Sequence, residues 1–234
     1  TDVRLLAIDE AHCISQWGHD FRPDYLRLGA VRHALGEVPT IALTATATPE
    51  VADDILAQLD LSDARRFITG FDRENLRLEV ALTRTPKAKL TMLPGLITEL
   101  PALVYCATRR HVEEVTELLS ARGFTAEAYH AGRGHAARKK VQEDFIQGRL
   151  PVVVATNAFG MGVDKADIRT IIHFDMPGTI EAYYQEVGRA GRDGKPASAI
   201  LMFRSADRQL QEFFINNAHP PAADVHQVYE ALLS

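Results

Sequence analysis

Short apolar runs alternate with amphipathic segments along almost the whole chain, and this alternation constrains the fold more than any other feature. Extended segments are expected at Val3–Asp9, Thr40–Thr44, Arg66–Thr69, Leu76–Leu82, Ala102–Cys106, Thr125–Tyr129, Val152–Ala155, Thr170–Phe174 and Ala199–Phe203. Helices are expected at Asp24–Leu35, Pro49–Leu59, Lys87–Leu100, Arg109–Arg122, Gly134–Gln147, Ile180–Gly188 and from Ala206 onwards. Continuous apolar strands separated by helices are typical of parallel sheets with helices on both faces. The sequence therefore predicts an α/β fold.

Two changes in composition suggest where this fold divides. The polar stretch Leu82–Lys87 is the expected hinge, and a stretch rich in Asn, Pro and Ala follows at Asn216–Asp224. We therefore expect three parts: residues 1–83, residues 84–207, and a helical stub in residues 208–234. Because Thr1–Ile8 already has the pattern of a buried strand and lacks an initiator Met, we also expect the chain to be a fragment.

The composition is that of an ordinary soluble protein. Of the 234 residues, 46% are hydrophobic and 24% charged, and the net charge of −5 argues only weakly against a nucleic-acid partner, because a large enzyme can carry one basic groove. Cys13 and Cys106 are the only cysteines, so no disulfide framework and no four-ligand zinc site is expected. With no signal peptide and no membrane-spanning run, the expected location is the cytoplasm, at the nucleoid in a bacterium.

Paired acids stand at the end of the first predicted strand. The sequence there is Asp9-Glu10-Ala11-His12. Carboxylates at the carboxyl ends of parallel strands lie where open α/β sheets bind ligands. One acid can hold Mg²⁺ directly or through water, and the other can polarise the water that attacks a nucleotide. The simpler alternative is an acidic strand end that caps the next helix.

The segment Ser15–Tyr25 is aromatic and has neither helical nor strand periodicity. It contains Trp17, the only tryptophan, with Phe21 and Arg22 close by. Aromatic rings and guanidinium planes stack on unpaired bases, at about 1–3 kcal/mol per base. Trp17 and Phe21, four residues apart, would also suit ordinary core positions. The nearby acids favour a loop that senses DNA.

The run Asp9–Tyr25 resembles the DEAH box and aromatic-rich loop of the RecQ family of superfamily 2 DNA helicases, and Leu43–Thr48 resembles that family's coupling motif. Without the resemblance, the latter would indicate only a strand followed by a helix. The resemblance implies tandem RecA-like lobes, the first partial and the second nearly complete. It also implies an ATP and Mg²⁺ site with Asp9 and His12, coupling by Gln16, Thr44 and Thr46, and DNA contacts by Trp17, Phe21 and Arg22.

Later segments resemble the same family's motifs that face DNA and nucleotide. These segments are Leu103–Arg110, Tyr129–Gly132 and Val152–Arg169. A strand end followed by a helix N-terminus is a natural phosphate seat. The residues expected to contact DNA are Thr108, Arg109, His130 and Thr156, with packing as the alternative for His130. Gly160, Met161 and Gly162 would allow close approach of the loop, and Asp164 would accept hydrogen bonds from a ribose or an arginine.

The segment Gln185–Gly194 contains Gln-x-x-Gly-Arg-x-x-Arg, expected at the end of a helix. The alternative is a basic helix C-terminus favoured by the helix dipole, which would explain one arginine but not the whole pattern. Guanidinium groups suit the oxygens of a transferring phosphoryl group. The resemblance implies that Gln185 lies at the ATP site, that Arg192 is the arginine finger and that Arg189 is its partner.

The sequence contains no Gly-x-x-x-x-Gly-Lys-Ser/Thr, the loop that holds the β- and γ-phosphates in P-loop motors. We therefore expect this chain alone to show little or no ATPase activity in a phosphate-release assay. The resemblance implies a parent protein that unwinds DNA in the 3′-to-5′ direction with ATP and Mg²⁺, acting on single strands and duplex junctions. The alternatives are a DEAD/DEAH-type RNA helicase and a non-enzymatic module that binds nucleic acid or a partner.

Overall fold

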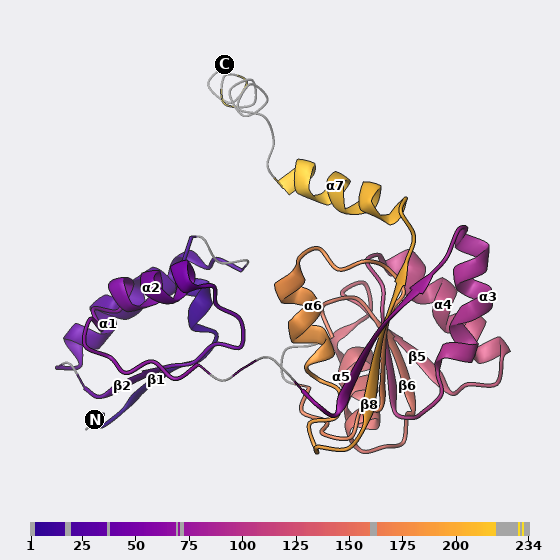
Figure 1. Ribbon diagram of the computed structural model, residues 1–234, viewed down its shortest axis with the longest axis horizontal. Helices are drawn as coiled ribbons and strands as arrows, with labels where there is room; N and C mark the ends of the chain where they lie inside the picture. The colour runs from indigo at the N-terminus through magenta and orange to yellow at the C-terminus, as the bar shows by residue number, and fades with distance from the viewer. Residues whose placement is uncertain are drawn as a thin grey trace. The chain divides into compact units, whose positions relative to one another are not determined.

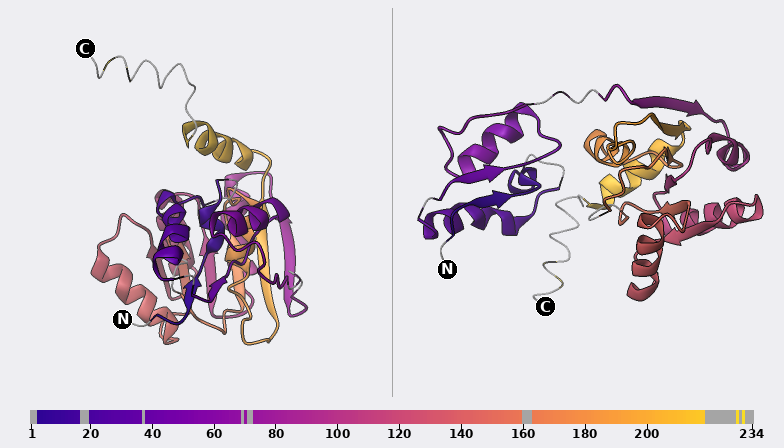
Figure 2. Two further views of the ribbon diagram at one scale, coloured as in Figure 1. Left: turned by 90° about the vertical axis from the view of Figure 1, so that its left-hand side faces the viewer. Right: turned by 90° about the horizontal axis from the view of Figure 1, so that it is seen from below.

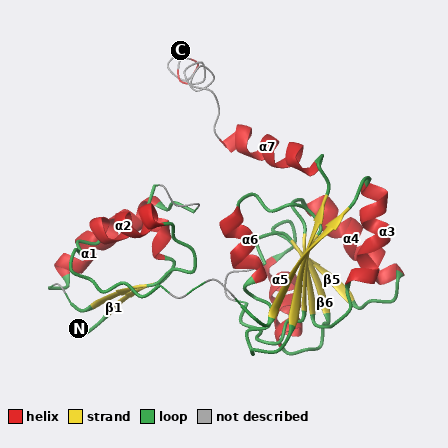
Figure 3. Cartoon of the chain, viewed as in Figure 1, coloured by secondary structure: helices red, strands yellow, loops and turns green. Residues whose placement is uncertain are grey.

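The computed structural model describes residues 3–16, 20–36, 38–68, 70, 73–159 and 163–218, together with Tyr229 and Ala231. The chain forms two compact units, one of Thr1–Asp72 with Thr179–Gln185 and one of Arg73–Gly178 with Glu186–Ser234. Both contain parallel strands accompanied by helices, which confirms the predicted α/β class (Figure 3). Trp17, Gly160, Met161 and Gly162 lie outside the described residues.

The first unit has a short parallel pair of strands, with Ile8 opposite Ala42. Its elements are β1 (Leu6–Ile8), two 3₁₀ helices η1 (Ala11–Ile14) and η2 (Pro23–Arg27), α1 (Leu28–Ala34), β2 (Thr40–Ala42) and α2 (Pro49–Gln58). Helices α1 and α2 lie together on one side of the strands (Figure 1). The core of this unit consists of buried apolar side chains from β1, η1 and the α2 segment, namely Ile8, Ala11, Ile14, Val51, Ile55 and Leu59.

One helix expected in this unit is two elements. Instead of one helix over Asp24–Leu35, a 3₁₀ turn beginning at Pro23 precedes α1. Gly29 explains how closely α1 packs, because a Cβ at this position would lie 2.5 Å from the carbonyl oxygen of Gln58. A larger residue at position 29 would push α1 away from the end of α2.

The second unit is built on a six-stranded parallel sheet with the strand order β3-β8-β7-β4-β6-β5. The strands are β3 (Leu76–Leu82), β4 (Ala102–Tyr105), β5 (Ala126–Tyr129), β6 (Val152–Ala155), β7 (Thr170–His173) and β8 (Ala197–Phe203). The helices of this unit are α3 (Pro86–Leu96), α4 (Arg109–Ala121), α5 (His135–Ile146) and α7 (Asp207–Ala218). Helix α6 (Ile180–Val187) follows β7 in the chain, and its residues up to Gln185 belong to the first unit. Every residue of β4, β6 and β7 is buried, so both faces of the sheet are covered, as expected for continuous apolar strands.

Strand β3 places the division between the units earlier than expected. All seven of its residues pair with β8, from Leu76 opposite Ala197 to Leu82 opposite Phe203. The units therefore divide between Asp72 and Arg73, whereas the sequence suggested a boundary after Thr83. The polar stretch that suggested the hinge is the connection between β3 and α3.

Other expected elements are shorter or absent. Residues 66–68 form no strand, and Phe67 and Ile68 are exposed by 85% and 83%. Helix α3 ends at Leu96 rather than near Leu100, and Pro94, which cannot donate a backbone hydrogen bond, lies inside its last turn. Strand β1 is also shorter than expected, because it begins at Leu6 and not at Val3.

Helix α7 follows β8 and lies beyond the end of the sheet at which β8 ends (Figures 1 and 2). Its first residue, Asp207, pairs with the buried Lys89 of α3 at 2.5 Å, and Lys89 also donates to the carbonyl of Phe174. This buried ion pair ties the beginning of α7 to the sheet. Among the described residues, no helix has both the length and the apolar character needed to cross a bilayer.

Candidate functional site

The acidic pair of the first unit lies directly after β1. The backbone N–H of Glu10 donates to Oδ1 of Asp9 at 2.8 Å, so the two acids are held at one tight turn. Glu10 has a φ of 49° and a ψ of 42°, which is the left-handed backbone conformation that residues other than glycine seldom adopt. Strain of this kind, of order 1–3 kcal/mol, is concentrated at functional sites. This strain favours a functional role for the turn over the alternative of an acidic strand end that only caps a helix.

Replacing Glu10 with glycine is expected to relieve this strain. We expect Glu10→Gly to unfold at higher urea than Glu10→Ala, by about 1 kcal/mol in unfolding free energy, because glycine adopts the left-handed region without steric cost. Both variants lack the carboxylate, so their difference reports on the backbone alone. Equal stabilities in urea titrations would show that position 10 is not strained.

His12 connects the acidic turn to the segment that follows β2. The ring is 1% exposed, and its Nδ1 lies 2.8 Å from Oγ1 of Thr44 and 3.4 Å from Oε2 of Glu10. The hydroxyl of Thr44 in turn donates to the carbonyl of Thr46 at 3.2 Å. The structure thus brings together His12, Thr44 and Thr46, which the sequence assigned to the ATP site and to coupling.

The described part of the aromatic-rich segment is held by backbone and ionic contacts. The N–H of Arg22 donates to the carbonyl of Cys13 at 2.8 Å, and its guanidinium pairs with Asp20. Phe21 is half-buried, whereas Gln16 is exposed. Burial raises the pKa of the Cys13 thiol to about 11, and the nearby Arg22 opposes this rise. The stacking expected of Trp17 remains a prediction.

Strand ends of the second unit carry the residues expected to face DNA. Thr108 is the N-cap of α4, and its Oγ1 accepts the N–H of His111 at 3.1 Å. Arg109 is exposed at the first position of the same helix, and Thr156 lies half-buried immediately after β6. A helix N-terminus beside an exposed arginine is suited to an anion such as a phosphate.

His130 is more enclosed than a DNA-contacting residue would be. It is 6% exposed, its Nε2 lies 2.7 Å from Oε1 of Glu113, and its Nδ1 accepts the N–H of Gly132 at 3.2 Å. Arg133 binds the same carboxylate, with Nη2 3.1 Å from Oε2. The hydrogen bond from His130 and the pair with Arg133 lower the pKa of Glu113. This arrangement favours the packing alternative and a positioning role for His130.

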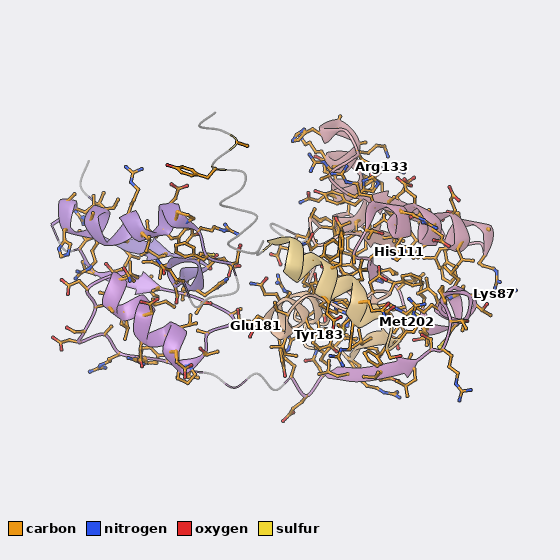
Figure 4. The ribbon with its side chains drawn as sticks, turned by 90° about the horizontal axis from the view of Figure 1, so that it is seen from above. Lys87, His111, Arg133, Glu181, Tyr183 and Met202 are labelled. Atoms are coloured by element: carbon orange, nitrogen blue, oxygen red, sulfur yellow. The ribbon has the colours of Figure 1, made fainter. Side chains whose placement is uncertain are left out.

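The sequence analysis did not single out Asp175, although this residue follows a predicted strand just as Asp9 does. This buried carboxylate accepts the N–H of Ala107 at 2.8 Å and lies 2.7 Å from Nδ1 of His111, so it joins the ends of β4 and β7. The hydrogen bond with Asp175 raises the pKa of His111. Figure 4 labels His111 among the side chains of the second unit. The rule that identified Asp9, a carboxylate directly after an apolar strand, would have found Asp175 as well.

The raised pKa of His111 gives stability that depends on pH. Because the pKa of His111 is raised in the folded state, its protonation stabilises the fold fully below the unfolded-state pKa of about 6.5. This stabilisation is lost as the pH rises through the folded-state pKa. We expect His111→Ala to lose about 1 kcal/mol more unfolding free energy near pH 5.5 than near pH 8.5. Urea titrations at both pH values test this, with the exposed His135→Ala as control. The same loss at both pH values would contradict the expected linkage.

Arg189 and Arg192 lie in turns beyond α6, not on a helix face as expected. Helix α6 ends at Val187, and hydrogen-bonded turns continue to Gly194. The Nη1 of Arg192 lies 3.2 Å from Oδ1 of Asp164, the acid expected to accept from an arginine or a ribose. Arg189 is half-buried near Tyr105, and it opposes the rise in the pKa of Tyr105 that burial causes. Gln185 is half-buried within α6.

Residues that the sequence analysis did not single out support this turn. The guanidinium of Arg73 donates to the carbonyls of Ala190 and Gly191, at 3.1 and 2.7 Å. Asn75 donates to the carbonyls of Gly191 and Lys195, both at 2.8 Å. These contacts join positions more than 110 residues apart in sequence, so no local pattern reveals them.

Gly191 is the residue on which the turn depends. Its φ is +57°, and a Cβ there would lie 2.6 Å from Nδ2 of Asn75 and 2.8 Å from the carbonyl oxygen of Lys195. We expect Gly191→Ala to lower the unfolding free energy by about 2 kcal/mol, from left-handed strain and displaced hydrogen bonds. Urea denaturation measures this, with Gly134→Ala as control because no atom lies within 4 Å of its added Cβ. A loss no larger than the control's would contradict the expectation.

The chain matches two helicase families and the fold of solved helicase structures. Residues 1–55 match the DEAD/DEAH box helicase family, and residues 88–194 match the helicase conserved C-terminal domain. Among solved structures, Dbp5 of S. cerevisiae bound to RNA and ADP BeF3 is 19% identical with a TM-score of 0.70, covering 92% of this chain and 57% of that one. A DEAD box protein of Methanococcus jannaschii is 24% identical with a TM-score of 0.60, covering 92% and 58%. At these identities the likeness concerns the fold, which is RecA-like.

Sequence relatives are much closer. The chain is 44% identical over 226 residues to the ATP-dependent DNA helicase RecQ of Haemophilus influenzae, covering 96% of this chain and 36% of that protein. It is 44% identical to the ATP-dependent DNA helicase RecQ of Bacillus subtilis, covering 93% and 37%, and 45% identical to the mouse Bifunctional 3'-5' exonuclease/ATP-dependent helicase WRN, covering 88% and 15%. The chain thus spans well under half the length of these relatives. It belongs to the RecQ family of superfamily 2 helicases.

Proposed function

We propose that the full-length protein containing this chain is an ATP-driven DNA helicase that moves 3′ to 5′ along one strand and acts in DNA repair and recombination. The observation that carries this proposal is the identity of 44–45% to ATP-dependent helicases across 88–96% of the chain. The strained acidic turn at Glu10 and its connection through His12 to Thr44 support it, because a pure binding module needs neither.

The proposed chemistry is hydrolysis of the γ-phosphate of ATP. Glu10 would orient and polarise the attacking water, and Arg192, assisted by Arg189, would neutralise charge that develops on the phosphate oxygens. The carboxylate of Asp9, a hard oxygen donor beside Glu10, fits a magnesium ion held through water. Bound Mg²⁺ would neutralise phosphate charge.

Coupling and DNA contact form the second part of the proposal. The His12–Thr44–Thr46 hydrogen bonds would transmit the state of the acidic turn to the segment after β2, with Gln16 acting beside them. Trp17, Phe21, Arg22, Thr108, Arg109 and Thr156 would contact DNA, and His130 would position its neighbours. Because backbone contacts dominate such binding, affinity should fall steeply with salt and depend little on sequence.

Unwinding assays separate this proposal from an RNA helicase. With ATP and Mg²⁺, the full-length protein is expected to separate a DNA duplex with a 3′ single-stranded tail, and to leave the 5′-tailed duplex and the matched RNA duplex intact. Preferential unwinding of the RNA duplex would favour the RNA-helicase alternative. Absence of unwinding with retained DNA binding would favour the non-enzymatic module.

A further inference from the structure

Three potential metal-binding atoms meet beside the acidic turn of the first unit. Nε2 of His12, Sγ of Cys13 and a carboxylate oxygen of Asp20 all lie within 4.8 Å of one another. His12 and Cys13 are buried, whereas the side chain of Asp20 is 47% exposed. Two fixed ligands inside the protein and one at its surface form a site that a cation can reach from solvent.

The distances between these atoms fit a tetrahedral ion. Sγ of Cys13 lies 3.7 Å from Nε2 of His12 and 3.7 Å from Oδ2 of Asp20. Zinc bonds of about 2.3 Å to sulfur and about 2.0–2.2 Å to nitrogen and oxygen, at tetrahedral angles, separate such ligand atoms by about 3.6 Å. The two distances from sulfur thus match tetrahedral coordination, and a ring nitrogen of His12 lies within 4.8 Å of a carboxylate oxygen of Asp20.

Thr44 and Glu10 contact Nδ1 of His12, whereas Nε2 lies 3.7 Å from Sγ of Cys13. Thr44 gives its hydroxyl hydrogen to the carbonyl of Thr46, so it accepts from Nδ1 of His12. The carboxylate of Glu10, 3.4 Å from Nδ1, favours a proton on the same nitrogen. The lone pair of Nε2 then faces Cys13. Partners of this type fix the tautomer and orientation of histidine ligands in metal sites.

We propose that His12, Cys13 and Asp20 form a binding site for a divalent transition-metal cation of the zinc type, with water as the fourth ligand. A thiolate and an imidazole are soft to intermediate ligands, which Zn²⁺ prefers and Mg²⁺ avoids. On binding, the Cys13 thiol releases its proton to solvent as the sulfur–metal bond forms. The metal also competes with the guanidinium of Arg22 for the carboxylate of Asp20.

A zinc ion bound here would be contrary to the expectation that the chain has no zinc site. That expectation considered only pairs of cysteines, and Cys13 and Cys106 lie far apart in the sequence. The spacing His-Cys-x₆-Asp offers three ligands of different types within nine residues, a weaker signal than paired cysteines. Because His12 also contacts Thr44, an occupied site would fix the segment between β1 and Asp20.

Cobalt binding to the 234-residue chain tests this proposal independently of ATP hydrolysis. We expect one equivalent of Co²⁺ to produce a thiolate-to-cobalt charge-transfer band and the visible bands of a tetrahedral ion. Zn²⁺ should remove these bands by displacement, and excess Mg²⁺ should leave them. The matched variants are Cys13→Ser, expected to abolish the charge-transfer band, and Cys106→Ser, expected to retain it, because Cys106 is buried in the core of the second unit.

Asp20→Asn provides a second test that does not depend on a buried position. We expect its Co²⁺ dissociation constant to rise at least tenfold, since the surface ligand is weakened while His12 and Cys13 remain. Absence of a charge-transfer band in the unaltered chain would overturn the proposal. So would a band that survives in a Cys13→Ser variant, or Co²⁺ affinity that is unchanged in Asp20→Asn.

Discussion

Replacing Arg192 with alanine is expected to slow ATP hydrolysis by the full-length protein about 10³-fold or more, while ATP binding changes little. Arginines that stabilise a transferring phosphoryl group contribute about 10³–10⁵ in rate in the GTPases, because the charge they neutralise develops mainly in the transition state. A steady-state phosphate-release assay with saturating DNA measures the rate. A fluorescent ATP analogue measures the affinity.

The structure makes this variant informative, because Arg192 contributes little to the fold. Its side chain is 41% exposed, and the side chain of its partner Asp164 is 88% exposed, so their ion pair is screened by solvent. A loss of activity in Arg192→Ala therefore reports on chemistry and not on unfolding. The matched control is Arg77→Ala on β3, whose side chain is 75% exposed. Equal turnover by the two variants would exclude Arg192 as the arginine finger.

Replacing Glu10 with glutamine is the second change with a large expected effect. The amide keeps the size and hydrogen-bonding reach of the side chain but cannot accept a proton from water. We expect turnover to fall by about 10²–10⁴, the usual contribution of a positioned general base, with ATP affinity nearly unchanged. Single-turnover hydrolysis is the suitable measurement, because it isolates the chemical step from product release.

Glu79→Gln serves as the matched control for Glu10→Gln. Glu79 lies on β3, its side chain is 38% exposed, and it pairs with Arg77. We expect its turnover to equal that of the unaltered protein. If Glu10→Gln and Glu79→Gln turned over ATP at the same rate, Glu10 would have no role in activating water.

Most of the fold could be predicted because each buried strand carries its own signal. Strand β6 has the predicted bounds, Val152–Ala155, because a short apolar run with three consecutive valines favours a fully buried strand. The ends of elements were less predictable. The end of α6 depends on the turns that follow it, and the place of β3 depends on its pairing with β8, which lies far away in the sequence.

In the candidate site too, some residues could be proposed from local sequence patterns and others only from contacts in the folded chain. Asp9, Glu10, Arg189 and Arg192 could be proposed from the sequence because residues of the right type follow strand or helix patterns, and their roles stay predictions. Contacts such as Arg73 with Gly191, or His130 with Glu113, join residues whose own surroundings are unremarkable in sequence. Only the folded chain brings them together. The left-handed conformation of Glu10 also has no signature in its residue type, because glycine or asparagine would be expected there.

The double variant Glu10→Gln/Arg192→Ala tests most directly the central claim, that this acid and this guanidinium serve one chemical step in ATP hydrolysis. Groups that act as a unit have strongly non-additive effects on rate. We predict that single-turnover hydrolysis by the double variant is little slower than that of the slower single variant. A rate lowered by the product of the two single effects would show that the two residues act independently and would contradict the proposed mechanism.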